Sequence, residues 1–426
     1  MTRAGRALAV LLVLLTGLAA TVWWLGVRDA SPGPTDAAAP IPADEARARG
    51  AYLAKAGNCV GCHTRRGGAT LAGGRAIATP FGTVYASNLT PDAQTGIGLW
   101  SADDFWRALH HGRSRDGRLL APAFPYTSLT RVTRADADAL YAWLMSQPPV
   151  AEANRAHSLR WPLGTQAALA VWRALYFRAG EQAVDPSQSA EWNRGAYLVQ
   201  GLAHCAECHG ARNALGGLKA DGDTGGQLPM QEGYAPSLHR ATEAGVADWP
   251  LADIVALLRT GQSARGHASG PMAEVVRQST QHLTDADLQA MAVYLKSLPQ
   301  WPEMPAAASA ATASGSGQPG KRLYEDHCAR CHGARGDGVP GAYPALAGNR
   351  AVLMADTTNL VQAVLHGGFA PVTAGNPRPY GMPPFVLVLD DAQIAAVLSH
   401  LRSAWGHAAP KVTELEVNRV RAAQGR

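Results

Sequence analysis

Three stretches of the chain place apolar residues at the i, i+3, i+4, i+7 spacing of an amphipathic helix. They cover residues 133–147, 284–298 and 390–403, and each opens with Thr or Asp. These residue types cap helices, because their side chains accept hydrogen bonds from the first free amides. Apolar residues at this spacing form one buried face. The pattern therefore predicts three amphipathic helices that each close a separate segment.

A second set of helices is predicted upstream of these, at 46–58, 192–204 and 320–327. The first two share the tract RGAYL, and the third has KRLYE in its place. A glycine-rich stretch and a middle helix follow in each segment. These middle helices are predicted to end at the pairs His111-Gly112, Thr260-Gly261 and His366-Gly367. The repeat is too long for a solenoid and indicates tandem helical domains.

The N-terminal run 7–27 contains no charged residue and, as a helix, would cross a hydrocarbon core of about 30 Å. Arg3 and Arg6 precede it, which favours a cytoplasmic N-terminus. A cleaved signal peptide is the alternative, with a weak cleavage site at 17–19. The apolar run continues past that site to Trp24, so an uncleaved anchor is favoured. Both interpretations place the remaining chain in the periplasm.

These patterns divide the chain into successive parts. The connector contains an amphipathic, aromatic stretch at 159–177, which we expect to pack between domains; contact with a partner or with the membrane surface is the alternative. The expected parts are a signal anchor at 1–28, a Pro/Ala linker at 29–44, a first repeat at 45–150, the connector at 151–190, a second repeat at 191–300, a linker at 301–317, a third repeat at 318–405 and a tail at 406–426.

Composition excludes several classes of protein. Hydrophobic residues make up 47% of the 426 residues and charged residues 17%, which excludes a disordered chain. The net charge is +5, and no run of Lys or Arg exceeds two residues, so nucleic acid is not an expected partner.

The six cysteines carry the most specific signal. They form three C-x-x-C-H motifs that use every cysteine of the chain. A zinc site would need four gathered ligands, whereas C-x-x-C-H is the attachment signal of haem c. The two thiols form thioethers, and the adjacent imidazole becomes the proximal ligand of the iron. The sequence thus predicts three covalent haem c groups, held by Cys59, Cys62 and His63, by Cys205, Cys208 and His209, and by Cys328, Cys331 and His332.

Methionines follow the middle helices of the second and third repeats. Met272 and Met382 are the predicted sixth ligands there, and a His/Met pair raises the reduction potential of a haem. Met230 and Met291 are rivals in the second repeat, and Met354 is a rival in the third. Core packing is the usual role of methionine.

The first repeat departs from this pattern, because Phe124 stands where a methionine is expected. Met145 lies on the closing helix, where packing explains it. His111 aligns with His366 and is expected to cap its helix or to meet a propionate. His110 has no counterpart in the other repeats and is a weak candidate for the sixth ligand. A five-coordinate iron, or a ligand from another domain or subunit, is an equal alternative.

The order of helix, C-x-x-C-H, glycine-rich loop and closing helix resembles class I cytochromes c. Beyond the anchor, the chain resembles the triple-haem cytochrome c subunits of bacterial membrane-bound dehydrogenases. This resemblance implies an all-α fold of three tandem class I cytochrome c domains behind an N-terminal transmembrane helix. The tracts that carry it are RGAYLAKAGNCVGCHT at 49–64, TPFGTVYASNLTPD from 79, WNRGAYLVQGLAHCAECHG at 192–210 and SGPMAEVV from 269.

The resemblance implies an electron acceptor for a quinoprotein alcohol dehydrogenase, a flavin-dependent gluconate dehydrogenase or a molybdenum hydroxylase. The alcohol-dehydrogenase form has Met in place of Phe124. The AFPY tract and the LRWPLG connector favour a molybdenum hydroxylase that acts on an aldehyde or an N-heterocycle. The implied partners are that catalytic subunit, an iron–sulfur subunit, the membrane, and ubiquinone or a terminal oxidase. The implied location is the inner membrane, single-pass, on the periplasmic side.

The sequence shows no catalytic constellation of its own, since it lacks a glycine-rich dinucleotide turn and a G-x-S-x-G elbow. Three alternatives to a relay stay open. An open first haem could support peroxidase chemistry or gas sensing, and cleavage of the anchor would release a soluble electron shuttle.

Overall fold

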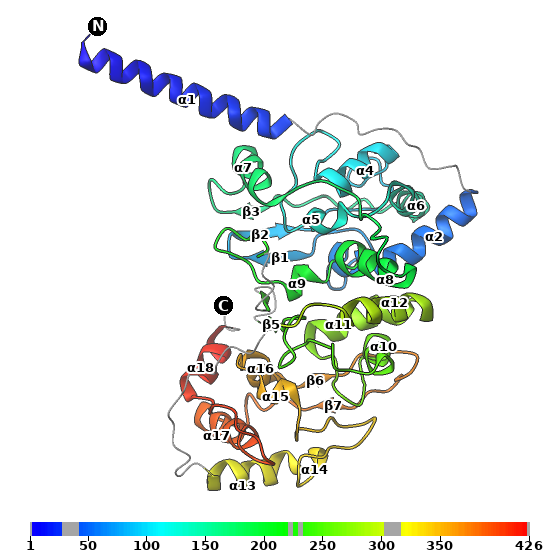
Figure 1. Ribbon diagram of the computed structural model, residues 1–426, viewed down its shortest axis with the longest axis vertical. Helices are drawn as coiled ribbons and strands as arrows, with labels where there is room; N and C mark the ends of the chain where they lie inside the picture. Colours follow the sequence, from blue (N-terminus) through cyan, green and yellow to red (C-terminus); the bar gives the residue numbers. More distant parts are fainter. Residues whose placement is uncertain (1, 28–41, 220–224, 229–232, 302–316, 424–426) are drawn as a thin grey trace. The chain divides into compact units, whose positions relative to one another are not determined.

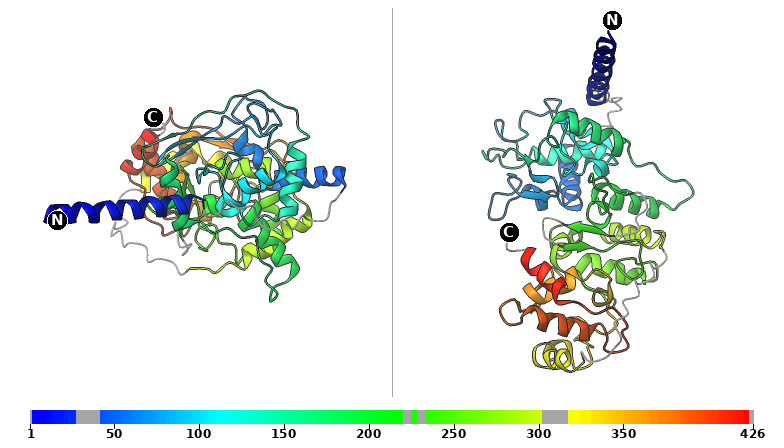
Figure 2. Two further views of the ribbon diagram at one scale, coloured as in Figure 1. Left: turned by 90° about the horizontal axis from the view of Figure 1, so that it is seen from above. Right: turned by 90° about the vertical axis from the view of Figure 1, so that its left-hand side faces the viewer.

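The computed structural model (Figure 1, with further views in Figure 2) describes residues 2–27, 42–219, 225–228, 233–301 and 317–423. Most of the predicted linkers 29–44 and 301–317, and the rival ligand Met230, lie outside these residues. The chain forms two compact units. The first contains Met1–Val184, Gln200–His204 and Ala214–Gly217, and the second contains Asp185–Val199, Cys205–Asn213 and Leu218–Arg426.

The N-terminal apolar run forms the helix α1 (Arg3–Val27). Near the C-terminal end of α1, Val22 and Leu25 pack against a small buried cluster that includes Leu169 of helix α7 (Gln166–Tyr176). Within the described ranges, no helix combines the length and the apolar character that crossing a membrane requires.

Each repeat contains a pair of helices in contact, one from its start and one from its end. The closing helices begin after Thr133, Thr284 and Asp390, whose side chains accept a backbone N–H as predicted. The pairs are α2 (Ala43–Ala56) with α6 (Arg134–Leu144), α8 (Ala190–Ala196) with α12 (Asp285–Lys296), and α13 (Gly317–His327) with α17 (Asp391–Leu401).

A glycine lies at each of these helix crossings. A Cβ atom at Gly50 or Gly195 would lie 2.0 Å from the carbonyl oxygen of Ala139 or Ala290, far inside ordinary van der Waals contact. A Cβ atom at Gly320 would lie 2.3 Å from the corresponding oxygen in the third pair. The glycine shared by RGAYL and by the third repeat therefore permits close backbone packing, a role that its lack of a side chain allows.

The arginine of RGAYL secures the first two crossings. Arg49 donates to the buried carboxylate of Asp136 at 2.6 Å. Arg194 binds Asp287 through two hydrogen bonds of 2.8 Å. Such two-point pairing fixes orientation as well as distance. The motif that repeats in the sequence is thus the contact surface for the closing helix.

The middle helices end where the sequence predicted. α4 (Ala102–His111), α10 (Leu251–Thr260) and α16 (Thr358–His366) are each followed by a glycine with positive φ. The angles are 58° at Gly112, 75° at Gly261 and 62° at Gly367, in the region that favours glycine.

Short antiparallel strands supplement the helical fold and were not predicted. β1 (Ala76–Thr79) and β2 (Gly82–Tyr85) form a hairpin in the first repeat, and β3 (Ser158–Leu159) of the connector joins its edge. β4 (Gly226–Leu228) pairs with β5 (Gly233–Ala235), and β6 (Gly368–Phe369) pairs with β7 (Gly381–Met382). These strand pairs provide hydrogen-bond partners for backbone N–H and carbonyl groups in the loops between the helices.

The remaining helical elements are short or follow the repeats. They are α3 (Cys59–His63), α5 (Tyr126–Leu129), the π-helix Tyr197–Leu202, α9 (Ala206–His209), α11 (Gly270–Gln278), the 3₁₀ turn Thr280–His282, α14 (Ala329–His332), α15 (Arg350–Leu353) and α18 (Glu414–Ala423).

The predicted tail contains an ordered helix, α18, which packs on α16 and α17. Val417 is fully buried, and Arg421 donates to Asp391 at 2.6 Å and to the Leu389 carbonyl at 2.9 Å. Sequence analysis assigned this segment to a tail and did not predict the helix. The helix is held by apolar packing of Val417 and by polar contacts with distant residues, which composition does not reveal.

Apart from residues 200–204 and 214–217, the second repeat shares the second unit with the third repeat, and polar contacts connect them. The backbone N–H of Tyr234 donates to the Asn359 side chain at 3.0 Å, and that side chain donates back to the Tyr234 carbonyl at 2.6 Å. Gln281 donates to the Val372 carbonyl at 3.3 Å. These hydrogen bonds connect the two repeats within the second unit.

Candidate haem-binding sites

The three C-x-x-C-H motifs have the same local structure. Each forms a short helical turn, as α3, α9 and α14, after the opening helix of its repeat; in the second repeat the π-helix lies between the two. None of the six cysteines forms a disulfide. Burial, followed by the neighbouring cysteine, raises the pKa of Cys59 and of Cys205 to about 12 and that of Cys328 to about 11. The first cysteine of each motif is therefore held as an uncharged thiol.

Each motif histidine is fixed by a backbone carbonyl. The Nδ1 atom lies 2.7 Å from the Ser87 oxygen for His63, 2.7 Å from the Pro236 oxygen for His209, and 2.9 Å from the Pro344 oxygen for His332. A carbonyl can only accept, so Nδ1 carries the proton and Nε2 keeps its lone pair.

Burial lowers the pKa of all three imidazoles, which therefore stay neutral. A neutral imidazole with Nδ1–H bound to an acceptor is the form that ligates a metal. The donor sets thus fit haem c at all three positions. Sequence analysis missed these carbonyl partners, because any residue type can supply them.

The third site contains a large cavity of about 1,030 Å³. Cys328, Cys331 and His332 line it, and Met382 of β7 lines it as well. The structure therefore brings the predicted sixth ligand to the same cavity as its motif. The volume lies at the upper end of ligand pockets, as a porphyrin needs.

The predicted ligand Met272 of the second repeat is the third residue of α11 and is half-buried. Its rival Met291 is 1% exposed on α12. Met354, the rival in the third repeat, is 5% exposed, and its carbonyl accepts from Arg402 at 2.8 Å. Packing accounts for both rivals. Ligation by Met272 stays a prediction.

Comparison with known proteins agrees with this geometry. The cytochrome c family matches residues 193–299 and 317–405. The cytochrome c subunit of a quinone-dependent alcohol dehydrogenase from Gluconobacter oxydans is 39% identical, over 86% of this chain and 80% of that protein. The chain belongs to the cytochrome c subunits of bacterial dehydrogenases.

Two further relatives carry the names of other dehydrogenases. The cytochrome c subunit of gluconate 2-dehydrogenase from Pantoea cypripedii is 39% identical, over 85% of this chain and 86% of that protein. A nicotinate dehydrogenase subunit from Pseudomonas putida is 41% identical over 87% of this chain, which spans 32% of that longer protein. Identity alone therefore does not separate the possible partner enzymes.

The first repeat of this cytochrome subunit has the same loop register as the second. Leu119 pairs with Arg113 just after Gly112, and His267 pairs with Gln262 just after Gly261. Five residues after these bridges stand Phe124 and Met272. By this spacing, Phe124 occupies the sequence position that Met272 has in the second repeat.

The structure places His110 against other side chains of the first repeat. Its ring stacks on Trp106, with centroids 4.2 Å apart. Burial lowers the pKa of His110, although the charge of Glu181 and a hydrogen bond with the Thr130 backbone favour the protonated form. Its Nδ1 atom is buried without a hydrogen bond. His110 as sixth ligand stays a prediction.

Residues of the second repeat also line the cavity at the third C-x-x-C-H motif, and sequence analysis missed them. They include Trp249 and His267. No sequence signal identifies these residues, because they reach the cavity only through the packing of two repeats.

Proposed function

We propose that this cytochrome subunit carries three haem c groups and passes electrons singly from a catalytic dehydrogenase subunit to ubiquinone or to a terminal oxidase. The observation that carries the proposal is the recurrence of one donor set at three sites. Each set has two cysteines outside any disulfide and a neutral histidine held through Nδ1. Haem c, when bound, supplies an iron that alternates between the ferrous and ferric states.

The protein's contribution to this relay is to hold and tune each site. The Nδ1 contacts fix the ring orientation of His63, His209 and His332 and raise their basicity toward iron. Met382, and by analogy Met272, would supply a thioether that favours a high potential. Phe124 removes that thioether from the first site, which would then differ in potential from the other two.

We favour a molybdenum hydroxylase acting on an aldehyde or an N-heterocycle as the partner enzyme. Phe124 in the AFPY tract supports this choice, and so does the 41% identity to a nicotinate dehydrogenase subunit. A quinoprotein alcohol dehydrogenase is the second candidate. It is favoured by the relative from Gluconobacter oxydans, of which the chain covers 80%.

We also propose that the subunit lies on the periplasmic side of the inner membrane, anchored by residues 7–27. The support is the sequence, which has 21 uncharged residues behind Arg3 and Arg6. Carbonate extraction of native membranes tests it. Retention in the pellet supports the anchor, and release with the peripheral proteins contradicts it.

The partner can be tested by reduction of the haems in membranes that contain the tagged full-length chain. Aldehydes or N-heterocycles should reduce the haems, and growth with tungstate in place of molybdate should abolish the reduction. Chelation with EDTA, which strips quinoprotein enzymes of their metal, should leave it intact. Reduction by ethanol that is sensitive to EDTA and insensitive to tungstate would instead identify the alcohol dehydrogenase.

A further inference from the structure

The cavity of the third haem site is lined by two repeats rather than by one. Besides Cys331, His332 and Met382 of the third repeat, its wall contains His267 and Trp249 of the second. A class I cytochrome c domain ordinarily encloses its haem with its own loops. A second domain in this wall therefore needs a structural explanation.

A short loop with internal hydrogen bonds presents His267 to the cavity. The backbone N–H of Ala268 donates to the Gly261 carbonyl at 2.7 Å, and that of Ser263 donates to the Gly266 carbonyl at 2.9 Å. Gln262 and His267 form an antiparallel bridge between these contacts. The position of His267 is therefore set by backbone geometry and does not depend on a flexible chain.

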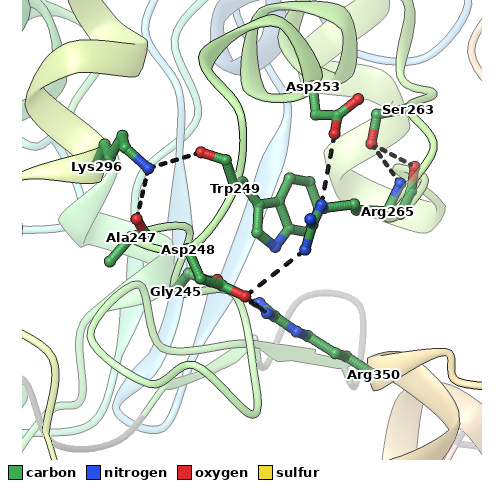
Figure 3. A network of polar contacts seen from close by, with 10 residues as sticks. Gly245, Ala247, Asp248, Trp249, Asp253, Ser263, Arg265, Lys296 and Arg350 are labelled. Carbon is green, nitrogen blue, oxygen red and sulfur yellow. Dashed lines mark hydrogen bonds and ion pairs between the residues drawn. The ribbon is translucent and has the colours of Figure 1, made fainter.

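Figure 3 shows the polar contacts that connect this region with Arg350 of the third repeat. Arg350 donates to both oxygens of Asp248, at 3.0 and 2.7 Å, and to the Gly245 carbonyl at 2.7 Å. Its guanidinium also lies 5.5 Å from the centre of the Trp249 ring, which is 6% exposed. Three hydrogen bonds from one guanidinium, beside an aromatic ring, resist rotation of one repeat against the other.

The polar groups around His267 are already engaged, whereas His267 is not. Arg265 lies 3.7 Å from Asp248 and 3.6 Å from Asp253. The structure gives the His267 ring no hydrogen bond among the described residues, although the side chain is exposed on the cavity wall. A group bound in the cavity would cover this exposed ring, and the covered imidazole would then need a hydrogen-bond partner from that group.

We infer that His267 contacts the third haem, so that the second repeat completes that haem's binding site and helps to set its potential. The inference rests on the proposed function, because it requires haem c at the third motif. The edge of a haem carries apolar surface and two carboxylates, and a neutral imidazole can pack on the first or donate to the second. His267 is a positioning residue, since Met382 is the predicted axial ligand.

The short chain segment between His267 and Met272 has a consequence for electron transfer. His267 precedes Met272 by five residues in the same loop and helix. The segment that carries the predicted ligand of the second haem therefore also contacts the third. The second and third haems form a fixed pair, whose exchange does not depend on domain motion.

The test is a redox titration of the haem-loaded full chain with four variants. His267→Leu removes the polar contact, and His267→Gln keeps a donor of similar reach. His239→Leu is the matched control, because His239 belongs to the same repeat, binds the Pro299 carbonyl at 2.9 Å and does not line the cavity. The variant Cys331→Ala, which should lack the third haem, identifies the wave of that haem.

We expect His267→Leu to shift the wave that Cys331→Ala removes, and to leave the other two unchanged. His267→Gln should restore most of the shift, and His239→Leu should have no effect. The absorption band near the red end of the spectrum, which reports methionine ligation of the haem iron, should persist in all His267 variants. Loss of the third haem from His267→Leu alone would also support the contact.

Unchanged potentials in His267→Leu, with three haems still bound, would overturn the inference and leave the proposed function intact. A shift confined to another haem would overturn it as well. A wild-type chain with no haem at the third motif would instead refute the three-haem proposal itself.

Discussion

The substitution Gly50→Ala tests whether the glycine of RGAYL is needed for the helix crossing in the first repeat. In the native structure a Cβ atom at this position would lie 2.0 Å from the Ala139 carbonyl oxygen and 2.7 Å from the Trp143 Cβ atom. Both neighbours belong to α6 at the crossing, and the oxygen is backbone, so neither can rotate away. Relief requires α2 and α6 to separate by roughly 1 Å, since contacts below 3.0 Å are essentially absent from proteins.

Two opposing effects set the magnitude. Overpacking of a closely packed contact costs about 1–3 kcal/mol. Alanine in place of glycine within a helix contributes about 1 kcal/mol of stabilisation. These two effects together leave a loss of up to roughly 2 kcal/mol in the free energy of unfolding of the first repeat. Separation also weakens the contact between Arg49 and Asp136, which adds to the loss.

The assay is denaturant unfolding of the haem-loaded full chain, followed by Soret absorption and by far-ultraviolet circular dichroism. The control is Gly17→Ala in α1, where nothing lies within 4 Å of the added Cβ atom. We expect Gly50→Ala to lower the unfolding midpoint and Gly17→Ala to leave it unchanged or higher. A Gly50→Ala chain as stable as the wild type would refute the packing argument.

Three further predictions follow from the sites and the core. Met382→His should replace the thioether signature of one haem by that of a bis-histidine haem and lower its potential, as measured by near-infrared magnetic circular dichroism, whereas Met291→Leu should change neither. Cys205→Ser combined with Cys208→Ser should reduce the haem count from three to two by intact mass, and an unchanged count would contradict attachment at the second motif. Burial by itself would raise the pKa of Asp391, but hydrogen bonds with Asn418 and Arg421 and the charge of Arg421 outweigh burial, so the pKa is lowered. The ionised Asp391 therefore stabilises the fold at pH values above the pKa of the unfolded carboxyl. This contribution is lost as the pH falls through the lower pKa of the folded state. Asp391→Asn should therefore flatten the acid limb of the unfolding profile, and an equally steep limb would exclude this group as a cause.

Local chemistry explains which predictions from the sequence were confirmed. The caps at Thr133 and Thr284 and the helix ends at Gly112 and Gly261 depend on hydrogen bonds or backbone angles within a few residues. All the participants are therefore visible in a short stretch of sequence. The helix α18 within the tail at 406–426 was not predicted for the opposite reason, since it is held by contacts with residues far away in the chain.

The sequence by itself determined which residues are predicted to attach haem covalently. The C-x-x-C-H motifs bring two thiols and an imidazole together within five residues, so haem attachment is predictable without a fold. Only the tertiary structure decided what surrounds those groups. The carbonyls that orient His63, His209 and His332 come from loops 12–27 residues away. His267 reaches the cavity at the third C-x-x-C-H motif through the packing of two repeats. These partners are backbone atoms or distant side chains, and their positions follow from chain folding, which no local pattern encodes.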